Sequence, residues 1–200
     1  MTGQDIINKF EMHTDDTTEL SSQEELELAN AKLRFIYDLQ AWEFLRKNKT
    51  GTVAAAGIVV PTDFLHCMVN YSEDMTSNLP DTAVVYLGGN PYKLIPMGMR
   101  NSSPITNVCW YNPSNRTIEF KENMAGQSYE FDYKYLPDDI TVSTEPVLPT
   151  SHYIVVYAML IDDDVIQKTD KARSNIVENT NAYGQQLSNL KSYNSKLFFI

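Results

Sequence analysis

The chain has 200 residues, of which 42% are hydrophobic and 11% aromatic, and its formal net charge is -10. This length predicts one domain, or one domain with a large insertion, and the apolar content suffices for a core, which excludes general disorder. The acidic balance argues against a protein that coats nucleic acid, because such proteins present basic faces to the phosphates.

The charge is unevenly distributed along the chain. Residues 1–30 hold eight acidic residues against Lys9 alone, whereas residues 165–200 hold five basic and two acidic residues. Ends of opposite sign favour packing of the two terminal segments on each other, or head-to-tail contact between copies. Solvated helix faces are the simpler interpretation of most of these charges.

Apolar periodicity predicts two helices at the start of the chain. Residues 3–13 place Ile6, Ile7 and Phe10 on one face. Ser21 or Ser22 begins the second helix, since each is followed three residues later by a glutamate, as in a capping box. Its core stripe comprises Leu26, Ala29, Leu33, Ile36 and Leu39.

An aromatic cluster follows the second helix. We expect Gln40–Arg46 to form a short helix and the poor helix formers of residues 48–51 to end the helical region. The second helix and this cluster form a predicted structural hub, whose members are Leu33, Ile36, Trp42, Phe44 and Leu45.

Strand patterns occupy the middle of the chain. Val53 and Ile58–Val60 are strand-like, and two pairs of strand-like segments flank the turn sequences at residues 88–91 and 112–115. The clearest strand is Ser128–Tyr135, where Tyr129, Phe131, Tyr133 and Tyr135 alternate with polar residues. Short strands separated by turns favour an antiparallel sandwich or barrel.

Two more helices are predicted after Pro149. Thr150 or Ser151 caps the first, with a stripe at Ile154, Ala158, Ile161 and Val165, and the last runs from about Lys171 beyond Ser192. The predicted fold is therefore α+β, in which N- and C-terminal helices form a bundle with an inserted antiparallel β-sandwich or barrel. Its predicted parts are the N-terminal helices at 1–49, the β module at 50–148 and the C-terminal helices and tail at 149–200.

No catalytic, metal or cofactor motif is present, so we expect no enzyme and no cofactor. His66 and Cys67 are adjacent and would point to opposite faces of a strand. Asp162-Asp163-Asp164 cannot converge on one cation because helix positions rotate by about 100° per residue, so a solvated helix face is favoured. Cys67 and Cys109 are expected to be buried, reduced thiols.

Two features favour binding. The tyrosines of Ser128–Tyr135 suit stacking on sugars or bases, although core packing is the usual meaning of such alternation. The apolar end Leu197-Phe198-Phe199-Ile200 either docks on the protein's own core or inserts into a partner. Residues 1–10 lack the pattern of a secretory leader, and no run approaches the roughly 20 apolar residues of a membrane span, so no membrane partner is expected.

Short motifs in chain order resemble the head–tail connector (adaptor) proteins of tailed bacteriophages. The resemblance is carried by the stretches Leu20–Asn30, Trp42-Glu43-Phe44-Leu45, Val60–Phe64, Tyr133–Thr141, Pro146–Pro149 and Tyr157-Ala158, and by the long last helix. The chain resembles more loosely the tail tubular or gatekeeper ring proteins of short-tailed phages, which share the order helices–β–helices.

The resemblance implies a structural protein of the virion neck, made in the bacterial cytoplasm. Copies would form a ring, commonly a homo-dodecamer, beneath the portal protein, and would contact tail tube, nozzle or stopper proteins on the other side. Double-stranded DNA would pass without sequence-specific binding. The candidate portal-binding residues are Lys196, Leu197, Phe198, Phe199 and Ile200. A tail-completion or collar protein, and a carbohydrate-binding β-sandwich, remain as alternatives.

Overall fold

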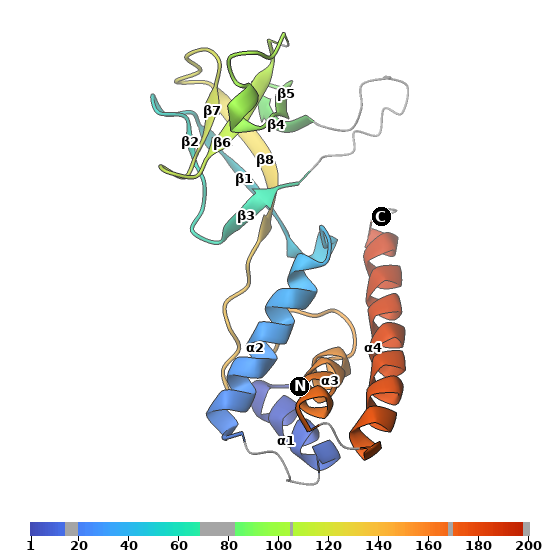
Figure 1. The fold of residues 1–200 in the computed structure, drawn as a ribbon. Helices are drawn as coiled ribbons and strands as arrows, with labels where there is room; N and C mark the ends of the chain where they lie inside the picture. Colours follow the sequence, from blue (N-terminus) through green and yellow to red (C-terminus); the bar gives the residue numbers. More distant parts are fainter. Residues whose placement is uncertain (15–19, 69–82, 105, 168–169, 198–200) are drawn as a thin grey trace. The chain divides into compact units, whose positions relative to one another are not determined.

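The computed structural model describes residues 1–200 except 15–19, 69–82, 105, 168–169 and 198–200. The fold is α+β, with helices at both ends of the chain and a nearly closed mixed β-sheet between them (Figure 1). The chain divides into two compact units, a helical unit of residues 1–44 and 137–200 and a β module of residues 45–136. These divisions differ from the sequence-based boundaries after residues 49 and 148, because the first strand begins at Arg46 and the last ends at Tyr135.

The two N-terminal helices begin and end close to their predicted positions. Helix α1 spans Gly3–Thr14 and helix α2 spans Ser22–Asp38. Ser21 is the N-cap of α2, and its reciprocal bonds with Glu24 form the predicted capping box. Ala29, Leu33 and Ile36 are buried as expected, whereas Leu39 is 39% exposed, so its assignment to the core stripe was wrong.

A connecting segment, residues 137–149, returns the chain from the β module to the helical unit and packs on the first two helices. The Asn30 side chain exchanges two hydrogen bonds with the backbone of Ile140, and Arg34 makes a two-pronged contact with Asp139. Gly3 lies so close to this segment that a Cβ atom there would be 2.3 Å from the Thr141 carbonyl oxygen. Only glycine fits this approach.

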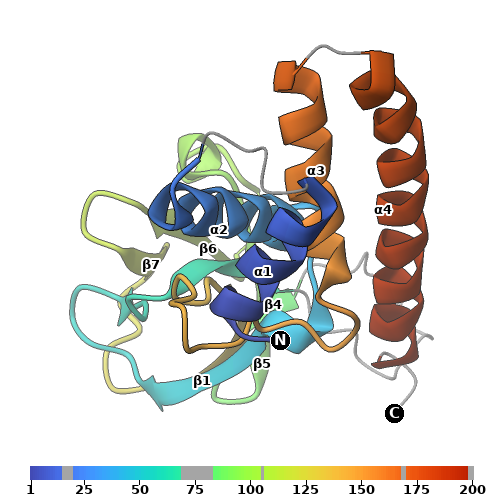
Figure 2. The same ribbon diagram turned by 90° about the horizontal axis from the view of Figure 1, so that it is seen from below.

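Helix α3 spans Tyr153–Gln167 and helix α4 spans Asp170–Leu197. Ile154, Val155, Val156 and Met159 are fully buried, because α1, α2 and α4 all contact α3. Figures 1 and 2 both show α2 and α4 on either side of α3. Val165, predicted for the α3 core stripe, is 55% exposed in the last turns of that helix.

The β module has eight described strands, joined in one sheet with the order β1-β8-β4-β5-β6-β7-β2 and with β3 paired to β8. Their bounds are β1 Arg46–Thr52, β2 Ile58–Val59, β3 Phe64–Cys67, β4 Ala83–Leu87, β5 Asn90–Leu94, β6 Val108–Asn112, β7 Thr117–Phe120 and β8 Ser128–Tyr135. One pair, β5 with β6, is parallel, so the expectation of a purely antiparallel sheet was wrong. The chain between those two strands includes the short 3-10 helix η2, Met97–Met99, which turns it back to the same end of the sheet.

Both predicted hairpins form. Gly88 and Gly89 have φ of 53° and 85° between the paired residues Leu87 and Asn90, which matches the two-residue turn that twisted strands prefer. The predicted helix at Gln40–Arg46 is instead the 3-10 helix η1, Glu43–Leu45. It is followed directly by β1, so the helical region ends before residues 48–51, which were expected to end it.

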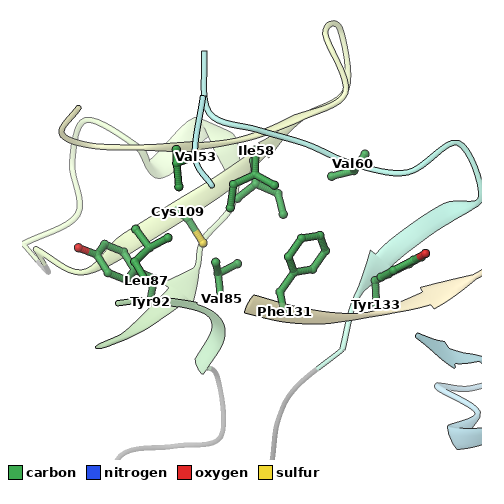
Figure 3. Packing of buried hydrophobic residues seen from close by; sticks show 10 residues of the cluster. Val53, Ile58, Val60, Val85, Leu87, Tyr92, Cys109, Phe131 and Tyr133 are labelled. Atoms are coloured by element: carbon green, nitrogen blue, oxygen red, sulfur yellow. The ribbon is translucent and has the colours of Figure 1, made fainter. Parts of the chain in front are cut away.

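The core of the β module gathers inward-pointing side chains from most of its strands. Phe131 and Tyr133 of β8 are buried among aliphatic side chains from the other strands, together with the Cys109 thiol (Figure 3). Phe64 and Phe131 form an edge-to-face pair with ring centroids 6.4 Å apart. The alternation in β8 therefore marks one core-facing side of a strand.

Candidate interaction site at the end of the last helix

The final turns of α4 are fixed to the segment that follows α2. Leu190 and Asn194, one turn apart, are both buried. The Asn194 side-chain oxygen accepts a hydrogen bond of 2.6 Å from the backbone N–H of Glu43, the first residue of η1. This bond satisfies a donor at the start of η1 and holds the end of α4 in place.

Trp42 precedes this contact and anchors the predicted hub in the helical unit. Its ring is fully buried, its Nε1 donates to the Ile36 carbonyl oxygen at 2.7 Å, and it packs against Phe44 with centroids 5.4 Å apart. The bond closes the C-terminal end of α2, where backbone carbonyls lack helical partners. Leu33 and Ile36 are buried with it, whereas Phe44 is partly exposed. Leu45, also buried, belongs to the β module.

The candidate portal-binding residues begin just after this fixed point. Lys196 is exposed in the last turn of α4, and Leu197 is the last residue of the helix. Phe198, Phe199 and Ile200 lie outside the described residues. The structure thus brings the end of α4 beside Trp42 and Glu43, two regions that the sequence placed far apart. Asn194 gave no recognisable signal because asparagine inside a helical pattern usually indicates exposure.

The acidic run in α3 differs from the solvated face that we expected. Asp163 and Asp164 are buried, and Asp162 forms an ion pair with Lys32 of α2. The Asp164 carboxylate accepts hydrogen bonds from Asn179 at 2.8 Å and Asn175 at 3.4 Å, both from α4. In the sequence, this contact is indicated by the spacing of Asn175 and Asn179, which is about one helical turn and places both amides on the same side of α4.

The adjacent residues His66 and Cys67 are not arranged as a base and a nucleophile. His66 is exposed, while burial raises the pKa of the neighbouring Cys67 thiol to about 12, so that its nucleophilic thiolate is scarce at neutral pH. Burial likewise raises the pKa of the Cys109 thiol. In the described part of the chain, no three His, Cys, Asp or Glu side chains are grouped as metal ligands.

A hollow of about 340 Å³ lies on the β module. Its walls are residues 53–57 and 119–124. Glu119 lies there, but its carboxylate accepts bonds from Trp110, Asn112, Asn115 and Thr117 within the β6–β7 hairpin. Lys121, a second charged residue of the lining, donates to the Ser103 carbonyl oxygen. Glu119 and Lys121 thus both make hydrogen bonds within the β module.

The two units differ in net charge. The β module has eight basic and eight acidic residues, whereas the helical unit has eight basic and eighteen acidic residues. The whole net charge of -10 therefore belongs to the helical unit.

Comparison with protein-family models gave no match, and comparison with curated proteins gave no significant match either. Among the described residues, no helix combines the length and apolar character required to traverse a lipid bilayer.

Proposed function

We propose that this chain is a structural head-to-tail adaptor of a phage virion, which forms a ring under the portal protein, extends the DNA channel and provides a platform for the tail. The observation that carries the proposal is the segregation of charge. A helical unit with ten more acidic than basic residues repels phosphate, so a ring of such units lets DNA slide rather than adhere. The motif order that resembles the adaptor family supplies the rest of the argument.

The proposed subunit is a helical bundle whose chain contains an inserted β-barrel. Support for the bundle is that all four helices pack within one unit. Support for the barrel is that β1 and β2, at opposite ends of the strand order, are joined by only residues 53–57. Such a short corner keeps the two edges of the sheet near each other.

The portal contact is assigned to Lys196–Ile200. Asn194 fixes the end of α4 on Glu43, and Lys196 beyond it is exposed, so the last described turn of the helix is both held in place and accessible to a partner. A rigid attachment lowers the entropy lost when a segment binds a partner.

Mass measurement of the purified protein mixed with the portal protein of the same virion tests the function. We expect a ring of adaptor copies on the portal, and a variant that lacks residues 197–200 should stay folded and fail to dock. The matched control is Ser195→Ala, which removes an exposed hydroxyl bonded only to its own helix at Lys191. Normal docking by the truncated protein would contradict the assignment of the contact.

A collar or tail-completion protein is the second candidate, because the acidic unit suits any part of the DNA channel. It predicts binding to tail proteins in the same experiment and none to the portal. The carbohydrate-binding alternative receives no support, since Phe131 and Tyr133 are enclosed in the core of the β module.

A further inference from the structure

Helix α2 carries a second apolar stripe on a side that its own unit leaves open. Leu28, Ala31, Phe35 and Leu39 recur at steps of three and four residues, so they follow one side of the helix. Phe35 is 57% exposed and Leu39 39%, Ala31 is exposed and Leu28 is partly exposed. Exposed large apolar side chains in a row are typical of a surface that another molecule covers.

Helix α4 offers a surface of complementary shape. Its outward side carries Thr180, Gly184 and Ser188 at steps of four, and all three are exposed. A Cβ atom built at Gly184 meets nothing within 4 Å, so the backbone is open to close approach. Small residues at this spacing form a shallow groove into which the bulky side chains of another helix can pack.

The groove is somewhat shorter than the stripe. Leu28 and Leu39 are eleven residues apart, about 17 Å at 1.5 Å per residue, and Thr180 and Ser188 are eight residues apart, about 12 Å.

The charges are also complementary. Exposed acids flank the α2 stripe at both ends, with Glu24 and Glu27 before it and Asp38 near its end. Exposed bases flank the α4 groove at both ends, with Arg173 before it and Lys191 after it. When the two helices run antiparallel, Glu27 lies opposite Lys191, and this pairing of opposite charges favours the contact of α2 with α4 over that of α2 with another α2.

We infer that the α2 stripe docks on the Thr180–Gly184–Ser188 groove of a second copy of this chain. Because α2 and α4 lie on either side of α3 in one copy, each copy presents the stripe to one neighbour and the groove to another (Figure 2). A contact between two different patches is heterologous and generates rings or filaments rather than a closed dimer. The inference deepens the proposed ring and rests on it only for closure, since the contact itself needs no portal.

Directed cross-linking tests the contact without the portal. One batch of protein carries Ala31→Cys, and a second, tagged batch carries Ser188→Cys; both positions are exposed, and they lie opposite each other when the two helices run antiparallel. We expect a linked dimer when the batches are mixed at high concentration under mild oxidation, and only the background of the wild-type cysteines from either batch alone. No link in the mixture, or equal linking of Ala31→Cys with itself, would overturn the inference.

Matched substitutions at the groove separate docking from folding. The Cβ atom of Gly184→Leu meets nothing within 4 Å in its own chain, yet the leucine side chain fills the groove, so association should weaken at least tenfold while helical content is kept. Gly184→Ala is the control and should associate within a few-fold of wild type. Glu27→Lys and Lys191→Glu should each weaken association, and the two together should restore it. Wild-type association by Gly184→Leu would contradict the groove.

The outcomes distinguish this contact from the proposed function. If the copies cross-link but do not dock on the portal, the proposed adaptor function is contradicted and the contact between copies is supported. If wild-type protein forms a ring on the portal but no cross-link forms, the contact is contradicted and the adaptor function is supported.

Discussion

The helical unit and the β module place their charged and apolar residues differently. In the β module, charged side chains pair with each other, as Arg46 of β1 does with Asp132 of β8, and Lys47 of β1 with Asp63 in the turn before β3. The Lys47 ammonium also lies 3.9 Å from the Tyr135 ring centroid. The helical unit also pairs charges, as Arg34 does with Asp139, but it keeps a large acidic excess and most of the exposed large apolar side chains, among them Phe35, Ile166 and Val177. The β module thus balances its own charge, whereas the helical unit leaves acidic and apolar side chains exposed.

Loss of an aromatic side chain from the β core is the strongest way to test whether the two units are independent. Phe131→Ala removes a fully buried ring that contacts Phe64, Tyr129 and Tyr133. The free energy of unfolding of the β module should fall by about 3–5 kcal/mol. Hydrogen exchange of the two units, measured by mass spectrometry, should show faster opening of residues 45–136.

The control for this variant is Phe131→Leu, which keeps most of the volume and should cost about half as much. Equal loss of protection in α1 and α3 would show that the helical unit depends on the module. The two units would then differ in amino-acid composition but would not be independent in stability.

Much of this division was accessible from the sequence because periodicity carries it. The α1 face, the α2 capping box, β8 and both hairpins were predicted correctly, and each depends on spacing or turn chemistry within a short segment. The sequence of β1, Arg46–Thr52, has no apolar alternation at all. It is a strand because seven residues pair with β8, where Asn48 reaches both Glu130 and Asp132.

The interaction site was predicted less well, for a physical reason. Asn194 bonds to a residue 151 positions away in the chain, and Asp164 to residues up to 15 positions away. No local sequence pattern encodes either of these hydrogen bonds. Phe35 and Leu39 are apolar residues at helical spacing, yet both are exposed. Such spacing does not reveal whether the chain itself buries these side chains.

Asp164→Ala tests the polar contact between α3 and α4. The Asn175 and Asn179 amides would lose their shared acceptor in a partly buried place, so the helical unit should lose about 1–3 kcal/mol of unfolding free energy. Urea unfolding followed by circular dichroism at 222 nm measures this change. Asp164→Asn keeps one acceptor oxygen and should cost less; a larger loss for Asn than for Ala would contradict the assigned bonds.

Glu119→Gln tests the equivalent polar centre of the β module. The Asn115 side chain, with Asn112, Trp110 and Thr117, donates to this carboxylate and outweighs its burial, so the pKa of Glu119 lies below its ordinary value. A depressed pKa means that the carboxylate contributes stability above the unfolded pKa of about 4.3, which is lost as the pH falls through the folded pKa. The variant should cost about 1–2 kcal/mol at pH 7. Urea midpoints at pH 7 and pH 3 should converge for variant and wild type at the lower pH; a constant difference would contradict the assignment.

Gly184→Ala has the smallest expected effect and distinguishes two reasons for glycine at this place. Gly184 lies in the interior of α4, it is exposed, and a Cβ atom there meets nothing. Alanine should therefore stabilise the isolated chain by about 0.5–1 kcal/mol, because glycine loses more backbone entropy on entering a helix. Thermal unfolding at low concentration measures the gain, and Ser188→Ala, also exposed in α4, calibrates the effect of propensity alone. A gain in the isolated chain would show that folding of the helical unit does not require glycine at this position. A loss would show instead that α4 needs glycine for its own packing, and the groove would then be a feature of the helical unit itself.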